Sequence, residues 1–179
     1  MKLLVLILSI LLLFPNCSTK RVKPSIDANL RIDELPSQES WNSVVTFSDS
    51  GKTKAMLWAG HFQKYDDKRE TFLDQNIKVD FFNPQEIHTT TLTSKRGRVD
   101  ETTNNLYAMD SVVVFSDSIT IRTDEMMWRN KDKKIVSDKF VTVISPQEKI
   151  EGYGFESDQS LTNYVIYNIT YVSRADTIK

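Results

Sequence analysis

Apolar and polar residues alternate with a period of two along most of this chain. Ile77, Val79 and Phe81 alternate with charged residues, and similar spacing recurs in later segments. This period predicts strands with one apolar face, because successive side chains of a strand point to opposite faces of the sheet. Residues 112–115 and 140–144 are continuous apolar runs of β-formers, which predict strands covered on both faces or nearly so.

Short turn sequences separate the predicted strands. They include Asn83-Pro84, Asp117-Ser118 and Ser145-Pro146, and Arg96-Gly97 is predicted as a further turn. Beyond the N-terminus, no window of twelve residues has the period of an amphipathic helix. Similar apolar strands followed by a turn and a strand recur about 30 residues apart. The sequence therefore predicts an all-β sandwich, roll or barrel built from repeated hairpins, with an edge strand at each end unless a barrel closes.

The N-terminal segment differs from the rest of the chain. Met1 and Lys2 precede the segment Leu3 to Phe14, in which Ser9 is the single polar residue. This run is shorter than the about 20 apolar residues that a transmembrane helix needs, and its layout is that of a secretory signal. We predict that residues 1–16 form a signal peptide.

The only cysteine of the chain, Cys17, follows this signal directly. The stretch Leu13-Phe14-Pro15-Asn16-Cys17 resembles a bacterial lipobox, although Asn16 replaces the small residue that lipoboxes favour. We therefore expect lipidation of Cys17; a secreted protein with a free thiol and an uncleaved anchor are the alternatives. Residues 17–39 contain two prolines and no aromatic residue, which predicts a lipid-anchored tether ahead of a folded domain at residues 40–179.

Composition and charge exclude several classes of function. The 179 residues fit one domain, and a net charge of -1 without a dense Lys/Arg block argues against nucleic-acid binding. One cysteine and two distant histidines exclude a disulfide framework and a zinc site, so no metal and no cofactor are expected. His61 and His88 lack a neighbouring nucleophile pattern, so no catalytic residues are predicted and the protein is expected not to be an enzyme.

The order of the strand and turn segments resembles that of one known family. The matching segments are 47–52, 77–83, 91–97, 110–114, 121–124, 128–129, 135–138 and 150–155. Their order and spacing, over about residues 41–172, are similar to those of the LptC family of lipopolysaccharide export proteins, within the OstA-like β-jellyroll superfamily. Well-known members are held by a transmembrane helix, whereas this chain is expected to use a lipid.

The resemblance implies an open, V-shaped β-jellyroll of two facing antiparallel sheets whose apolar trough carries lipopolysaccharide acyl chains. The cargo would come from the inner-membrane LptB/LptF/LptG transporter and pass to an LptA-like bridge protein that pairs edge to edge. This implies a periplasmic protein anchored to a membrane, the inner one by expectation. The residues expected to bind lipid are Ile77, Val79, Phe81, Leu92, Val112, Val114, Ile119, Ile121, Val141, Val143, Ile150 and Phe155.

The two edges of such a fold are the expected docking strands. The edge residues predicted on the transporter side are Trp41, Val45 and Phe47, and those predicted on the bridge side are Tyr164, Ile166, Asn168, Thr170 and Val172. Two other hypotheses about the function remain open at this point. One is a structural envelope lipoprotein with a closed β core that acts as a protein-binding adaptor, since an apolar stripe at strand spacing is more often core than ligand site. The other is a hydrolase-like domain that uses a pair of carboxylates.

Overall fold

The computed structural model describes residues 35–174 and places nine strands in that range. They are β1 (Gln38–Asp49), β2 (Lys52–Tyr65), β3 (Glu70–Phe82), β4 (His88–Asp100), β5 (Asn105–Ser116), β6 (Thr120–Arg129), β7 (Lys134–Ile144), β8 (Glu148–Asp158) and β9 (Tyr164–Arg174). Within this range no helix is long and apolar enough to cross a membrane. The predicted signal peptide, Cys17 and most of the predicted tether lie outside the described residues, and β1 begins at Gln38, within the last residues of that tether.

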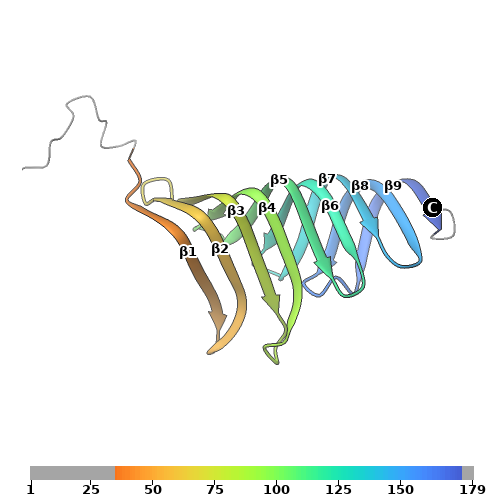
Figure 1. Cartoon of the computed structure of the whole chain (residues 1–179), viewed down its shortest axis with the longest axis horizontal. Coiled ribbons are helices and arrows are strands. Elements are labelled where there is room, and N and C mark those ends of the chain that lie inside the picture. The colour runs from red at the N-terminus through yellow and green to blue at the C-terminus, as the bar shows by residue number, and fades with distance from the viewer. Residues whose placement is uncertain (1–34, 175–179) are drawn as a thin grey trace, which may run out of the picture. The chain divides into compact units, whose positions relative to one another are not determined.

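All nine strands belong to one antiparallel sheet in which each strand pairs with its neighbours in the chain. Figure 1 shows this order as an unbroken succession of colours from β1 to β9. β1 and β9 pair on one side only, so the described sheet is open and has two edges. The predicted all-β, open fold built from hairpins is therefore confirmed.

Most strands are interrupted halfway along their length, and the interruptions bend the sheet. The register shifts between Asp74 and Ile77 in β3 and between Met109 and Val112 in β5, for example. The residues inside these two shifts, 75–76 and 110–111, have positive φ angles near 60°, as expected of bulges that turn a strand.

Gly154, with a φ angle of 77°, occupies the corresponding bend of β8, and two residues earlier this strand passes β9 closely at Gly152. A Cβ atom there would lie 2.4 Å from the backbone oxygen of Asn168, so this close approach of β8 to β9 requires glycine.

The bends fold the single sheet into two layers that face each other. Phe81 on β3 and Trp128 on β6 have ring centroids 6.1 Å apart, although β4 and β5 separate their strands within the sheet. Strands three positions apart in a flat sheet are about 14 Å apart, so these rings can meet only across the fold. The predicted pair of facing sheets is thus present as two halves of one continuous sheet.

One hydrophobic cluster, which we call the interior, fills the space between the layers. It takes alternate residues from both halves of the strands, and the opposite faces of the same strands are more exposed. Within the run 112–115, Val112 and Val114 are buried whereas Phe115 is 42% exposed. The prediction that such runs are covered on both faces was wrong, because each layer is one sheet thick and covers only its inner face.

The predicted turn at Arg96-Gly97 was also wrong. Both residues lie within β4, just after its register shift. A Cβ atom at position 97 would lie 3.2 Å from the backbone oxygen of Tyr107, so the glycine allows close pairing with β5.

Candidate functional site

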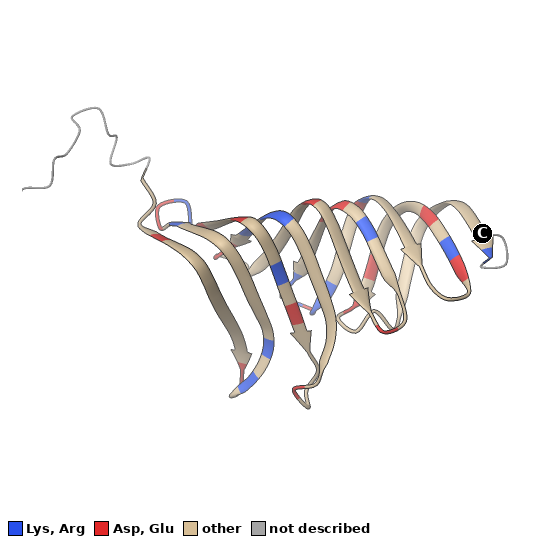
Figure 2. Cartoon of the chain, in the orientation of Figure 1, with Lys and Arg blue, Asp and Glu red and all other residues tan. Residues whose placement is uncertain are grey.

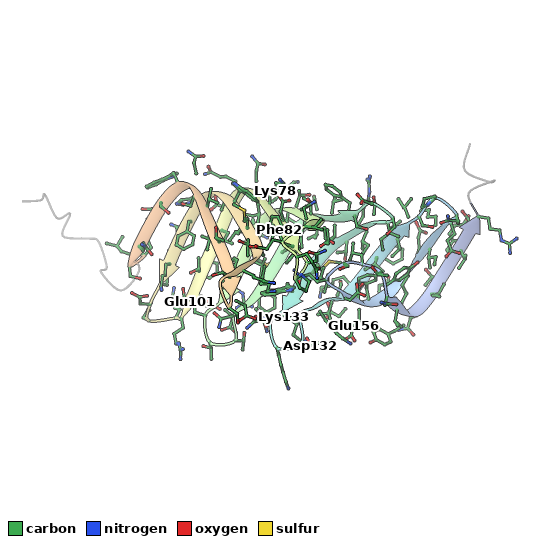
Figure 3. All side chains as sticks on the ribbon, turned by 90° about the horizontal axis from the view of Figure 1, so that it is seen from below. Lys78, Phe82, Glu101, Asp132, Lys133 and Glu156 are labelled. Carbon is green, nitrogen blue, oxygen red and sulfur yellow. The ribbon has the colours of Figure 1, made fainter. Side chains whose placement is uncertain are left out.

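The turns between strands form two rims along the open side of the folded sheet. We call the turns β1–β2, β3–β4, β5–β6 and β7–β8 the first rim, and the turns β2–β3, β4–β5, β6–β7 and β8–β9 the second rim. The line along which the rims approach each other is called the mouth. Figure 3 shows the side chains from below, with Phe82 of the first rim and Lys133 of the second rim labelled.

The predicted lipid-binding residues gather in the interior with one exception. All of them except Ile150 are buried, with exposed fractions of 7% or less, and Ile150 is half-buried. The period-two pattern therefore selected inner-face positions correctly. Their low exposure means that the two layers pack against each other along most of the sheet.

The row formed by Val143, Ile150 and Val172 shows where this packing ends. Val143 pairs with Ile150 across β7 and β8, and Ile150 pairs with Val172 across β8 and β9, so the three side chains share one face. Val143 is 1% exposed, Ile150 is half-buried and Val172 is 52% exposed. The interior is thus continuous with an apolar surface at the β9 edge, which no described residue caps.

The predicted edge residues of β9 divide between two environments. Tyr164 and Ile166 pack against the interior, and the Tyr164 ring stacks on Phe155 with centroids 5.9 Å apart. Asn168 and Thr170 are exposed, and the Thr170 hydroxyl donates a hydrogen bond of 3.1 Å to the backbone oxygen of Glu151. Further apolar residues of β9 are exposed: Val165 and Tyr171 lie on the outer face, opposite Glu156 and Glu151, whereas Ile169 pairs with Gly152, the partner of Val141, and so lies on the inner face.

At the opposite edge, β1 also carries its predicted residues on both faces. Val45 and Phe47 are half-buried against the interior. Trp41 is 60% exposed and stacks on His61 of β2, with ring centroids 5.3 Å apart. An edge strand with an exposed aromatic residue and unpaired backbone groups is a candidate docking surface.

His61 links three strands through its two ring nitrogens. Its Nε2 lies 2.8 Å from Glu39 Oε1 on β1, and its Nδ1 lies 3.2 Å from Asp74 Oδ2 on β3. The hydrogen bond with Glu39, aided by Asp74, raises the pKa of His61 above its ordinary value of 6.5. Sequence reasoning missed this cluster, because the three residues come from separate segments that only the sheet register brings together.

Charged residues lie outside the interior, and positive and negative side chains are interspersed there. Figure 2 shows Lys and Arg interspersed with Asp and Glu along the strands and turns. On the second rim, the hydrogen bond from Lys134 lowers the pKa of Glu156, and Arg129 bonds both Glu156 and Asp132, at 3.2 and 2.7 Å. Such pairs stabilise the rim without creating a field of one sign.

A cavity of about 470 Å³ lies at the mouth, between the rims. Its lining includes Lys54, Phe82 and Thr89 on the first-rim side and Trp128, Lys133 and Gln159 on the second-rim side. Sequence reasoning did not predict Trp128 or Gln159 as site residues. In the part of the chain that the structure describes, no three His, Cys, Asp or Glu side chains are grouped to hold a metal ion.

Comparison with known protein families gives a match over most of the chain. The family model described as "LptC: Lipopolysaccharide-assembly, LptC-related" matches residues 3–170, which is nearly the whole chain. No curated protein matches the chain.

Proposed function

The chain belongs to the family of LptC-related lipopolysaccharide-assembly proteins, and on that premise we propose that it is a membrane-anchored periplasmic carrier of lipopolysaccharide. In this proposal it receives the acyl chains from the inner-membrane LptB/LptF/LptG transporter and passes them to an LptA-like bridge protein. Membership of the family implies a role in lipopolysaccharide transport; the direction and the partners are the proposed part.

The observation that carries the proposal is the apolar row Val143, Ile150 and Val172. A carrier that hands on a fatty acyl chain needs an apolar path that leads out of the domain toward the next protein. Burying each CH₂ group on such a path is worth about 0.8 kcal/mol. The row provides that path at the β9 edge, where exposure rises from 1% at Val143 to 52% at Val172.

The two edge strands support the proposed partners. β9 offers unpaired backbone groups beside the uncapped end of the interior, so a strand of the bridge protein could extend the sheet and continue the apolar path. β1 offers the second edge, with Trp41 exposed beside it, and is proposed to face the transporter. The carrier would thus lie between donor and acceptor as one unit of a longer sheet.

The proposed anchor belongs to residues outside the described range. We propose that residues 1–16 are removed as a signal peptide, that Cys17 is lipidated and that residues 17–39 tether the domain to the inner membrane. Replacing Cys17 by alanine should then move the protein from the membrane fraction to the soluble periplasmic fraction. Membrane retention of the variant would contradict lipid anchoring.

A second candidate function has one specific observation in its favour. Nearly all the interior side chains are 7% exposed or less, so the two layers of the β core are closely packed along most of the sheet. A closed core would suit a structural envelope lipoprotein that acts as a protein-binding adaptor through its edge strands and binds no lipid.

Native mass spectrometry of the full-length protein, purified in detergent, distinguishes the two candidates. The protein is incubated with purified lipopolysaccharide and, separately, with phosphatidylglycerol as a control lipid. A stoichiometric adduct that prefers lipopolysaccharide supports the carrier, whereas absence of any lipid adduct supports the adaptor. In cells, normal delivery of lipopolysaccharide to the surface after depletion of the protein would contradict the carrier function.

A further inference from the structure

The closed interior raises the question of where an acyl chain could enter. Val114, Phe81 and Ile121 are each 0% exposed, so no acyl chain reaches them unless the two layers separate locally. Along the bends the layers are continuous backbone and cannot part. The β9 end of the interior is proposed above as the exit, so an entrance along the length of the sheet requires separation at the mouth, where the rims are held together by side chains and turns.

Among the described residues, only two hydrogen bonds join one rim to the other, and both involve Gln159. The buried Thr90 hydroxyl on β4 donates to the backbone oxygen of Gln159, at 2.9 Å. The Gln159 side-chain nitrogen donates to the backbone oxygen of Lys54 on β2, at 3.3 Å. The turn between β8 and β9, residues 159–163, is thus the link between the rims.

Leu161 anchors this turn in the interior. It stands among polar neighbours in the sequence, yet it is 1% exposed and belongs to the hydrophobic cluster of the interior. Its φ angle is 57°, a left-handed value that is uncommon for a residue other than glycine. The turn therefore accepts an unfavourable backbone conformation to place one aliphatic side chain between the layers.

Hydrogen bonds within the turn hold its conformation, so it can move as a rigid unit. The amides of Thr162 and Asn163 donate to the carboxylate of Asp158, at 2.9 and 3.1 Å, and the amide of Leu161 donates to the Asp158 backbone oxygen, at 3.2 Å. These bonds stay within residues 158–163. Releasing the turn from the first rim breaks only the two bonds of Gln159 and the burial of Leu161.

The cavity at the mouth adjoins the same turn. Gln159 and Ser160 line it together with Trp128 and Phe82, and most of its lining surface is apolar. Its volume of about 470 Å³ falls in the range of sites for small ligands. Trp128, which is 6% exposed, has an indole N–H without a hydrogen-bond partner among the described residues, which is unusual for a buried donor.

We propose that residues 158–163 form a latch over an acyl-chain port, and that an entering acyl chain takes the place of Leu161 between the layers. The proposal rests on the carrier function above and adds the point of entrance and the element that controls it. An acyl chain is the occupant that fits, because it has the aliphatic chemistry of the side chain that it displaces. Its ester or amide carbonyl offers an acceptor for the Trp128 N–H. The cavity lining carries three lysines and three aspartates, so no net charge selects the ligand there.

Two variants loosen the latch in different ways, and a third is a matched control. Thr90→Val removes the hydroxyl that holds Gln159 and keeps the shape of the side chain. Leu161→Gly removes the inserted side chain and suits the left-handed backbone. Thr93→Val removes another hydroxyl of β4, which donates to the backbone oxygen of Val113 within the sheet, at 3.4 Å, and so reports general loosening of the strand.

The first measurement needs no lipopolysaccharide. Amide hydrogen exchange of the full-length protein in phospholipid nanodiscs compares residues 158–163 with strands β3 to β7. A latch should open without global unfolding, so its amides should exchange faster than those of the strands. Thr90→Val should raise that exchange by about three- to tenfold, the effect of losing one hydrogen bond. Exchange of the latch at the rate of the strands in both proteins would overturn the proposal.

The second measurement is the rate at which the same samples take up fluorescently labelled lipopolysaccharide. Thr90→Val and Leu161→Gly should accelerate uptake, and Thr93→Val should leave it unchanged. Uptake by the wild type without acceleration in the latch variants, or with equal acceleration in Thr93→Val, would overturn the port and leave the carrier function standing. No uptake by any protein would overturn the carrier function itself, and the port with it.

Discussion

Two valines on β9 allow the proposed path of the acyl chain to be blocked with an internal control. Val172 is 52% exposed and shares the inner face with Ile150, its partner in register. Val165 is 54% exposed and pairs with Glu156, so it lies on the outer face of the same strand. Val172→Arg places a guanidinium at the uncapped end of the interior, whereas Val165→Arg places the same group on the outside.

The exposure of the two valines sets the expected loss of stability and the expected loss of lipid transfer. Full burial of a valine is worth about 1.5–3 kcal/mol, so replacing a half-exposed one should cost about 1 kcal/mol of stability. That loss is small beside a typical domain stability of about 5–15 kcal/mol, and both variants should fold. An acyl chain passing Val172→Arg must strip water from a charge, at an effective cost of several kcal/mol if the charge becomes fully buried. Since the site is half exposed and the side chain can reach solvent, we expect transfer to fall by about 10- to 100-fold.

The assay follows photo-crosslinkable lipopolysaccharide from the membrane-anchored protein to a soluble LptA-like bridge protein. Circular dichroism and thermal melting verify that both variants are folded. Val172→Arg should reduce transfer strongly, and Val165→Arg should retain transfer close to the wild type. Equal transfer by all three proteins, or an equal loss in both variants, would refute the path through the β9 end of the interior.

Three further predictions concern the fold that supports this path. Because the pKa of His61 is raised above 6.5 by Glu39 and Asp74, its stabilisation of β1 should be fully present below pH 6.5 and fade as pH rises through the raised pKa. Protection of the β1 amides from hydrogen exchange, measured as a function of pH, should fall in the same way. The same pH profile in His61→Gln would contradict this role of His61. Gly152→Ala should lower stability by about 1–3 kcal/mol, since its Cβ would lie 2.4 Å from a backbone oxygen of β9; an unchanged melting temperature would be the contrary result. Val114→Arg, at 0% exposure, should fail to fold because it buries an unpaired charge; a folded variant by circular dichroism would show that the interior opens there.

Sequence reasoning identified the strands and their inner faces because both are local properties. The alternation around Ile77, Val79 and Phe81 specifies which side chains share a face, wherever the strand lies in the sheet. The structure buries all three at 2% exposure or less. The same logic failed at Arg96 and Gly97, where glycine serves a close approach between strands within β4 and not a turn.

The candidate site likewise contains residues that the sequence could predict and residues that it could not. The inner-face residues and the two edge strands could be predicted from spacing and order alone. Leu161 could not, because an apolar residue in a polar turn gives no sign of where its side chain inserts. The contacts of Trp128 and His61 could not be predicted, because their neighbours come from distant segments.

By itself the sequence determined an all-β chain of repeated hairpins with an apolar face on each strand, since period-two alternation and turn residues act over a few neighbours. Tertiary structure decided where the single sheet bends, because the bulges depend on how adjacent strands are aligned in register. It also decided that the interior is packed along most of the sheet and uncapped at β9, and that the turn carrying Leu161 joins the two rims. These features require contacts between residues far apart in the chain, and such contacts exist only once the two layers have folded against each other.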